Sequence, residues 1–291
     1  FLPFSLVIVP YLLFRLVFAG LGGWLFARKI GLKPASCLVV GMGFMGSGYL
    51  VQYLNNQHLV IDLLIPYSLL VCERILERTS LKNFLLLVVV LVLIILGGQP
   101  GAGICTLGFA GAYFLFRSWS KGQLRAIWIF LPGLFLALNF CWIQLLPFLE
   151  AIPQSWTYHP PGWAEAHLEI KTFVSLLSPL IFGTASKIPF EIQKTFPWLG
   201  VTVFVLALIQ IFQLKNSRSI FSFFGLGIIF CLGIVYGLLG FDLILTLPGF
   251  NRVSWFKYLQ PIITFSALVL AGAGLERAFS SQKKAPLPGI I

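Results

Sequence analysis

Long and nearly uninterrupted apolar runs recur along this 291-residue chain, and they restrict the folds that it can adopt. Phe84–Leu96 and Trp198–Leu214 are two of these runs, and neither contains an Asp, Glu, Lys or Arg residue. Only 10% of the chain is charged, whereas soluble domains carry about 25% charged residues. A soluble fold could not bury so many apolar runs, and a membrane β-barrel would show alternating apolar residues. The sequence therefore predicts an all-α, polytopic transmembrane helical bundle.

Hydropathy predicts about nine membrane spans within a single transmembrane domain that covers residues 1–291. The predicted spans are 4–27, 35–52, 57–76, 82–98, 101–117, 125–148, 198–214, 219–239 and 257–279. Two connections are much longer than turns, namely 149–197 and a smaller segment at 240–256. The 149–197 connection is rich in aromatic residues, so we expect it to be ordered and to include a short amphipathic helix over Glu165–Ser178.

The basic residues sort onto alternate connections between the predicted spans. One set holds fourteen of the twenty Lys and Arg residues, a second set holds five, and Arg15 lies inside the first span. Cytoplasmic loops carry an excess of Lys and Arg, so the larger set predicts a cytoplasmic C-terminus and external segments at 149–197 and 240–256. The larger set is Arg28, Lys29, Lys33, Arg74, Arg78, Lys82, Arg117, Lys121, Arg125, Lys215, Arg218, Arg277, Lys283 and Lys284, and the smaller set is Lys171, Lys187, Lys194, Arg252 and Lys257.

The same orientation places Phe1 on the external side, although no signal-peptide pattern precedes the first span. We therefore interpret the chain as a fragment of a longer membrane protein that has at least one earlier span. The net charge of +11 is spread over separate cytoplasmic patches and forms no dense basic run, so we expect no nucleic-acid partner. The five cysteines fall inside predicted spans without zinc-ligand spacing, and we expect no metal site in this chain.

Side chains with acid–base capacity gather on the predicted external side. Six of the nine acidic residues lie there, and so do all three histidines, His58, His159 and His167. His58 and Asp62 share one helix face because they are four residues apart. Asp62 lies about one turn inside the apolar region, where an unpaired carboxylate is costly. The two residues form either an interfacial ion pair or part of an external cavity.

Basic residues at membrane depth are the other candidates for a binding site. Arg15 lies near the middle of its span, where an arginine either faces a ligand cavity or satisfies a local ion pair or backbone carbonyls. Asn251, Arg252 and Lys257 form the most concentrated external positive charge near the membrane. Because a guanidinium group binds phosphate through two hydrogen bonds, Arg252 indicates contact with a lipid-linked phosphate. The alternative role for this group is that of an anchoring charge at the membrane surface.

Short motifs in a consistent order resemble the YfhO-like family of bacterial membrane proteins. The motifs are Ala19–Gly23, Ala27–Leu32, Leu96–Pro100, Leu145–Glu150, Ser178–Gly183, Leu247–Arg252 and Gly272–Arg277. They extend over roughly residues 10 to 280. The family belongs to the GT-C type of polytopic glycosyltransferases. The resemblance implies a multi-pass protein of the bacterial plasma membrane that transfers a sugar from a polyprenyl-phosphate donor to an external glycan or glycolipid acceptor of the cell envelope.

The resemblance, together with the charges, gives a set of candidate site residues. Asp62 and Glu150 are the candidate catalytic carboxylates, because a glycosyl acceptor must be deprotonated. The principal catalytic carboxylate of the family would precede Phe1, as would the ligands of any divalent metal. A transporter or flippase of lipid-linked saccharides and a non-catalytic membrane scaffold are the alternative functions. The candidate substrate-binding residues are Arg15, His58, Gln99, Trp156, Tyr158, His159, Trp163, Asn251, Arg252 and Lys257, with Gln99 standing where the family often has His.

The orientation leads to a labelling prediction. A cysteine introduced at Ser155 or Asn251 is expected to react with a membrane-impermeant thiol reagent in intact cells, because both positions lie in predicted external segments. A cysteine at Ser120, in a predicted cytoplasmic connection, is expected to stay unlabelled until the cells are opened. Labelling of Ser120→Cys from outside would reverse the orientation.

Overall fold

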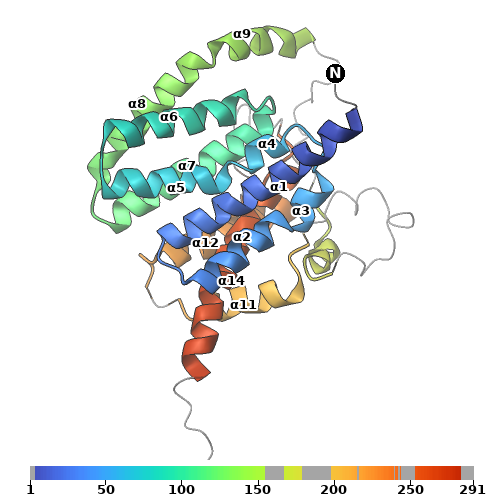
Figure 1. The fold of residues 1–291 in the computed structure, drawn as a ribbon, viewed down its shortest axis with the longest axis vertical. Helices are drawn as coiled ribbons and strands as arrows, with labels where there is room; N and C mark the ends of the chain where they lie inside the picture. The colour runs from blue at the N-terminus through green and yellow to red at the C-terminus, as the bar shows by residue number, and fades with distance from the viewer. Residues whose placement is uncertain are drawn as a thin grey trace, which may run out of the picture.

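The structure is a computed structural model that describes residues 4–154, 167–178, 198–214, 216–238, 240–241, 243 and 253–282. Every regular element within these ranges is helical, which confirms the all-α fold class. Figure 1 shows the helices packed side by side as a bundle, with α14 (Gln260–Gln282) running through it. Within Trp255–Ser280, which includes most of α14, 94% of an 18-residue window is buried inside the protein, so this helix is the centre of the bundle.

The helices follow one another through short connections. The first half contains α1 (Phe4–Lys29), α2 (Pro34–Met45), α3 (Gly48–Gln52), α4 (Leu59–Asp62), α5 (Ile65–Glu77), α6 (Leu81–Leu96) and α7 (Pro100–Ser120). The 3-10 helix η1 (Leu124–Ala126) then leads into α8 (Ile127–Phe140), α9 (Trp142–Ala151) and the 3-10 helix η2 (Ile152–Gln154). The remaining described elements are the 3-10 helix η4 (Ile170–Leu176), α11 (Val201–Phe212), α12 (Ile220–Tyr236), α13 (Trp255–Tyr258) and α14.

Three helical stretches are long and apolar enough to cross a membrane, namely Val7–Lys29, Pro34–Gln52 and Trp255–Ser280. The helix expected over 125–148 is bent, because Leu124–Phe140 and Trp142–Ala151 meet at 67°. The apolar helices α6, α11 and α12 are shorter than a full span. The described residues thus support a membrane protein, whereas the count of nine spans stays a prediction.

The expected helix over Glu165–Ser178 is corrected by the structure. Residues 167–178 contain the 3-10 helix η4, and residues 165 and 166 lie outside the described ranges. This segment packs on the bundle, because the Leu168 amide donates to the Val235 carbonyl at 2.9 Å, and the Leu199 amide donates to the Leu176 carbonyl at 3.0 Å. Residues 167–178 of the predicted 149–197 connection therefore contact the rest of the bundle.

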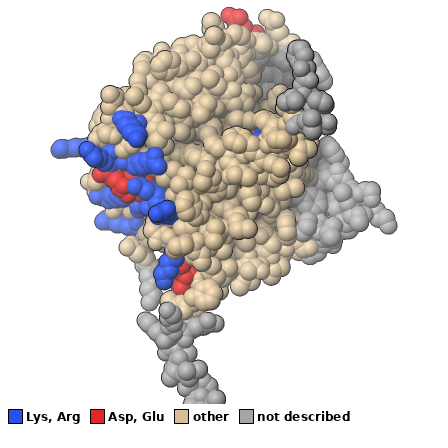
Figure 2. Space-filling view, viewed as in Figure 1, with Lys and Arg blue, Asp and Glu red and all other residues tan. Residues whose placement is uncertain are grey.

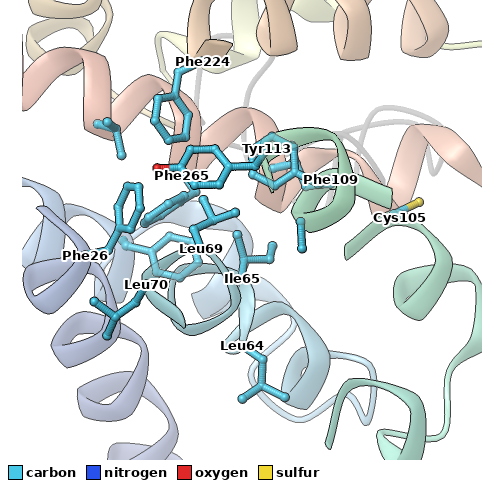
Figure 3. Packing of buried hydrophobic residues seen from close by; sticks show 14 of the residues in the cluster. Phe26, Leu64, Ile65, Leu69, Leu70, Cys105, Phe109, Tyr113, Phe224 and Phe265 are labelled. Carbon is cyan, nitrogen blue, oxygen red and sulfur yellow. The ribbon is translucent and has the colours of Figure 1, made fainter. Parts of the chain in front are cut away.

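Apolar side chains cover the outside of the bundle as well as its core. Soluble monomers rarely expose large continuous apolar surfaces, whereas a lipid-facing surface requires them. In the interior, aromatic rings from four helices meet, as Figure 3 shows for Phe26, Tyr113, Phe224 and Phe265. The outward-facing side chains that are more than 60% exposed include Phe14, Met42, Trp128, Phe135, Ile143 and Phe212.

Most of the described charged residues gather at one end of the bundle, which we call the basic end (Figure 2). Contacts between helices define this end: Lys29 forms an ion pair with Glu77, and Ser120 donates to the carbonyl of Arg218. The basic residues at this end all belong to the larger set of Lys and Arg found in the sequence. Their location at one end of the bundle agrees with the predicted separation of basic residues onto one side of the membrane. The described residues that mark the basic end are Arg28, Lys29, Arg74, Arg78, Arg117, Lys121, Arg218 and Arg277.

Close contact of helix backbones at glycine holds α11 against α14. A Cβ atom added at Gly274 would lie 2.0 Å from the Leu206 carbonyl oxygen, whereas one added at Gly108 would meet nothing within 4 Å. Small residues permit such contact in membranes, where lipid gives little hydrophobic drive for helix association.

Gly274→Ala is therefore expected to lower stability by about 1–3 kcal/mol, because α11 must move away from α14. Gly108→Ala is the matched control and should leave stability unchanged or raise it, since alanine has the higher helix propensity. Thermal unfolding of the purified protein in detergent measures both. Equal stability of the two variants would contradict the described packing.

Candidate functional site

At the end of the bundle opposite the basic end, polar side chains from five helical regions meet around Asp62. We call this group the Asp62 cluster. Its members come from α1, the α2–α3 unit, α4 with its N-cap, the turn before α7, and α13. They are Arg15, Tyr49, Tyr53, His58, Asp62, Gln99, Lys257 and Tyr258.

Interruptions of helices bring these side chains together. Gly46 and Ser47 separate α2 from α3, and the Ser47 hydroxyl accepts a hydrogen bond from the Leu50 amide to start the second helix. The helix within the predicted span 57–76 is also interrupted, because α4 ends at Asp62 and α5 begins at Ile65. Pro66 sits in the first turn of α5, where its missing N–H leaves no helical hydrogen bond unmade.

Asp62 is fully buried, and its carboxylate is only partly satisfied. The Tyr49 hydroxyl donates to Oδ2 at 3.1 Å, whereas Oδ1 has no hydrogen-bond partner among the described residues. Among the described residues, no ion pair joins His58 to Asp62. The interfacial ion pair that the sequence suggested for these two residues is therefore absent. Leaving a buried acceptor unpaired costs about 1–3 kcal/mol, and more for a charged group.

His58 lies against three tyrosine rings. Its ring centroid is 5.0 Å from that of Tyr53, 5.8 Å from that of Tyr258 and 6.3 Å from that of Tyr49. The imidazole is buried, and its Nε2 atom has no hydrogen-bond partner within the described ranges. His58 and Asp62 therefore each have one buried side-chain atom without a hydrogen-bond partner among the described residues.

Lys257 brings a positive charge over the aromatic side of the cluster. Its Nζ atom is 5.1 Å from the centroid of the Tyr53 ring and 5.5 Å from that of the Tyr258 ring. Cations are attracted to ring faces at such distances. Burial, followed by the charge of Asp62, raises the pKa of the Tyr53 phenol above its usual value, so this hydroxyl stays neutral.

Arg15 forms the other cationic side of the cluster. Nη1 donates to the Leu54 carbonyl at 2.6 Å, and Nη2 donates to the Asn56 carbonyl at 2.8 Å. These are the backbone hydrogen bonds considered for Arg15 from the sequence. The guanidinium group thereby holds the non-helical segment before His58.

Gln99 links the turn before α7 to the cluster. Its Nε2 atom donates to the Tyr258 hydroxyl at 2.6 Å. Gln99 precedes Pro100 and adopts the extended conformation that a following proline favours, with φ −124° and ψ 96°. Gly98 turns the chain at φ +80°, a conformation that suits glycine.

The structure brings together only some of the candidate residues. Asp62, His58, Gln99, Lys257 and Arg15 belong to the cluster. Glu150 is exposed on α9, and the described part of the chain shows no hydrogen bond or ion pair of its side chain. The candidates Trp156, Tyr158, His159, Trp163, Asn251 and Arg252 lie outside the described residues.

Sequence reasoning missed the tyrosines that surround Asp62. Tyr49 and Tyr53 are four residues apart, which places them on one helix face at the predicted external end of the second span. That spacing beside His58 and Asp62 was the available signal.

For a metal, the described ranges contain no group of three or more His, Cys, Asp or Glu side chains that could hold an ion.

A second buried carboxylate, that of Glu73 near the basic end, has complete partners. Its Oε1 accepts from the Tyr113 hydroxyl at 2.7 Å and from Arg117 Nε at 2.5 Å. Its Oε2 accepts from Arg117 Nη2 at 3.1 Å and from Lys121 Nζ at 3.0 Å. Glu73 therefore ties α5 to α7, whereas the carboxylate of Asp62 keeps one oxygen open.

No protein-family profile, curated protein or solved structure matches the chain.

The two carboxylates are expected to respond in opposite ways to amide substitution. Glu73→Gln should destabilise the protein by about 3–5 kcal/mol, because the partly buried charges of Arg117 and Lys121 lose their counter-charge. Asp62→Asn keeps an acceptor for Tyr49 and removes a buried carboxylate, so stability should stay equal or rise. Thermal unfolding in detergent measures both variants, and a larger loss for Asp62→Asn would make Asp62 a structural residue.

Proposed function

We propose that the complete protein is a membrane glycosyltransferase of the GT-C type, and that the Asp62 cluster handles the phosphate end of a polyprenyl-phosphate sugar donor. The supporting observation is the buried carboxyl group of Asp62, which has one oxygen without a hydrogen-bond partner among the described residues and shares its cluster with two cations, Lys257 and Arg15. Buried polar groups that lower the stability of the fold are typical of functional sites. The sequence resemblance to the YfhO-like family suggests the same chemistry.

The charged members of the cluster have chemical roles in this proposal. The hydroxyl oxygen of the acceptor attacks the anomeric carbon, the bond from that carbon to the donor phosphate breaks, and the acceptor proton passes to Asp62. Lys257 and Arg15 stabilise the negative charge of the departing polyprenyl phosphate. Arg252, five residues before Lys257, adds a bidentate contact to the same phosphate.

The membrane arrangement follows from the same proposal. The nine predicted spans cross the plasma membrane with the Asp62 cluster at the external face and the basic end in the cytoplasm. Trp156, Tyr158 and Trp163 belong to the external connection and offer faces on which sugar rings stack. Residues 167–178 of this connection pack against α12 through Leu168 and Val235, so it is anchored at the bundle.

A transporter or flippase of lipid-linked saccharides is the second candidate, and the helix interruptions favour it. Breaks at Gly46–Ser47, at Leu63–Leu64 and at Leu259 all adjoin the cluster. Discontinuous helices form the binding sites of many secondary transporters, because unwound backbone groups can hold a substrate. The two functions differ in their product, since a transporter moves the intact donor whereas a transferase consumes it.

The test is sugar transfer from a polyprenyl-phosphate donor by the complete protein in proteoliposomes. Asp62→Asn is expected to lower the rate by about 100-fold or more, because general-base catalysis contributes about 10²–10⁴-fold. Lys257→Ala should lower it by about 10–150-fold, the equivalent of one hydrogen bond to a charged group.

Glu169→Gln and Lys171→Ala are the matched controls, because these residues form an exposed ion pair outside the cluster. Their rates should equal that of the unchanged protein. Full transfer by a well-inserted Asp62→Asn protein would contradict the catalytic role of Asp62. Movement of intact donor across the membrane without transfer, lost in the same variants, would assign the cluster to a transporter.

A further inference from the structure

A partly open cavity of about 480 Å³, lined by both polar and apolar groups, lies at the basic end. It is formed where α11 ends, where α12 begins, and where the last turns of α14 pass between them. The lining residues are Gln213, Leu214, Asn216, Ser219 and Arg277. None of them takes part in the proposed transfer reaction, so the cavity calls for its own explanation.

The polar groups of the cavity include hydrogen-bond donors and acceptors, and the guanidinium group of Arg277 is its cation. Arg277 Nη1 donates to the carbonyl and to Oε1 of Gln213, at 3.0 and 3.1 Å. The Asn216 Oδ1 atom accepts from the Arg218 amide at 2.9 Å, so the side-chain NH₂ group stays available. Ser219 lies at the start of the 17-residue helix α12, whose N-terminus carries a positive partial charge.

No acidic side chain neutralises this cavity within the described ranges. Arg277 forms no ion pair there, and the neighbouring Glu276 accepts instead from the backbone amide of Lys33 at 2.5 Å. Gln210 lies one turn before Gln213 and Leu214 on the same face of α11. It is fully buried, and neither polar atom of its amide has a hydrogen-bond partner in the described part of the chain. Gln210 does not line the cavity, so an anion there would accept from the guanidinium group of Arg277 and the side-chain amide of Asn216.

The surroundings indicate that the anion is attached to a lipid. Phe212 and Phe279 lie beside Gln213 and Arg277, and they are 83% and 60% exposed. Exposed phenyl rings next to an arginine-containing cavity at the end of membrane helices match a lipid whose acyl chains lie along the bundle. We propose that this cavity binds the phosphate of an anionic phospholipid headgroup in the leaflet at the basic end.

The test uses the complete protein in detergent micelles. Bound lipid is counted by native mass spectrometry after addition of phosphatidylglycerol, or of diacylglycerol with the same chains as a phosphate-free comparison. Phosphatidylglycerol should be retained and diacylglycerol should not. Arg277→Ala is expected to lower retention about tenfold, the effect of losing one hydrogen bond to a charged group.

Asn216→Asp is the second variant, and we expect it to fold normally. A loss of lipid binding in this variant is then not explained by misfolding. Aspartate has the size of asparagine and keeps the acceptor for the Arg218 amide, but it places a negative charge in the cavity. Retention should therefore fall while thermal stability stays unchanged. Gln123→Glu and Arg125→Ala are matched controls, because both residues are exposed at the basic end outside the cavity, and they should retain lipid normally.

The outcomes separate the sources of phosphate. Two results together support a lipid headgroup. Phosphatidylglycerol is lost from Arg277→Ala and Asn216→Asp but not from the controls, and millimolar inorganic phosphate does not displace it from the unchanged protein. Competition by inorganic phosphate that depends on the same two residues keeps the phosphate chemistry but makes free phosphate the ligand. Unchanged retention in both variants, or an equal loss in both controls, would overturn the site.

Discussion

A hydrocarbon environment offers no hydrogen-bond partners, so a chain that crosses it must satisfy its own backbone groups. This constraint explains why the described residues are almost entirely helical and why interruptions are confined to a few places. The segment before His58 is one of them, and there the guanidinium group of Arg15 supplies two hydrogen bonds to carbonyls that no helix satisfies. Without Arg15, the backbone that positions His58 and Asp62 would lack partners.

Under the same constraint, the two buried carboxylates differ in how completely their oxygen atoms are hydrogen-bonded. Glu73 receives four hydrogen bonds from three side chains, and it fastens α5 to α7. Asp62 receives one from Tyr49 and keeps an oxygen without a partner among the described residues. A carboxylate is seldom buried in this way for stability alone, since the unmatched charge opposes folding. The contrast separates a structural acid from a candidate catalytic one inside a single bundle.

Much of this fold could be read from the sequence, because long apolar runs and the sorting of Lys and Arg depend on local composition. The helices and the gathering of basic residues at one end followed from these patterns. The breaks at Leu63–Leu64 and between α8 and α9 did not, because hydropathy does not distinguish a bent helix from a straight one. Hydropathy also could not show that Gln99 and Tyr258, 159 positions apart, share a hydrogen bond.

The site was partly predictable for a similar reason. Charged residues such as Asp62 and Lys257 stand out in an apolar chain, whereas Tyr49, Tyr53 and Tyr258 resemble the interfacial aromatic residues that are common in membrane proteins. Their role depends on tertiary contacts, through which Tyr49 reaches Asp62 and Lys257 lies over the other two rings.

The most direct test of the central claim is a cryo-electron microscopy structure of the complete protein with a non-hydrolysable polyprenyl-phosphate sugar bound. The account predicts the donor phosphate at the Asp62 cluster, with an oxygen about 3 Å from the Lys257 ammonium nitrogen and the acceptor side open toward Asp62. A donor phosphate bound elsewhere, with Lys257 still lying over the Tyr53 and Tyr258 rings, would contradict it.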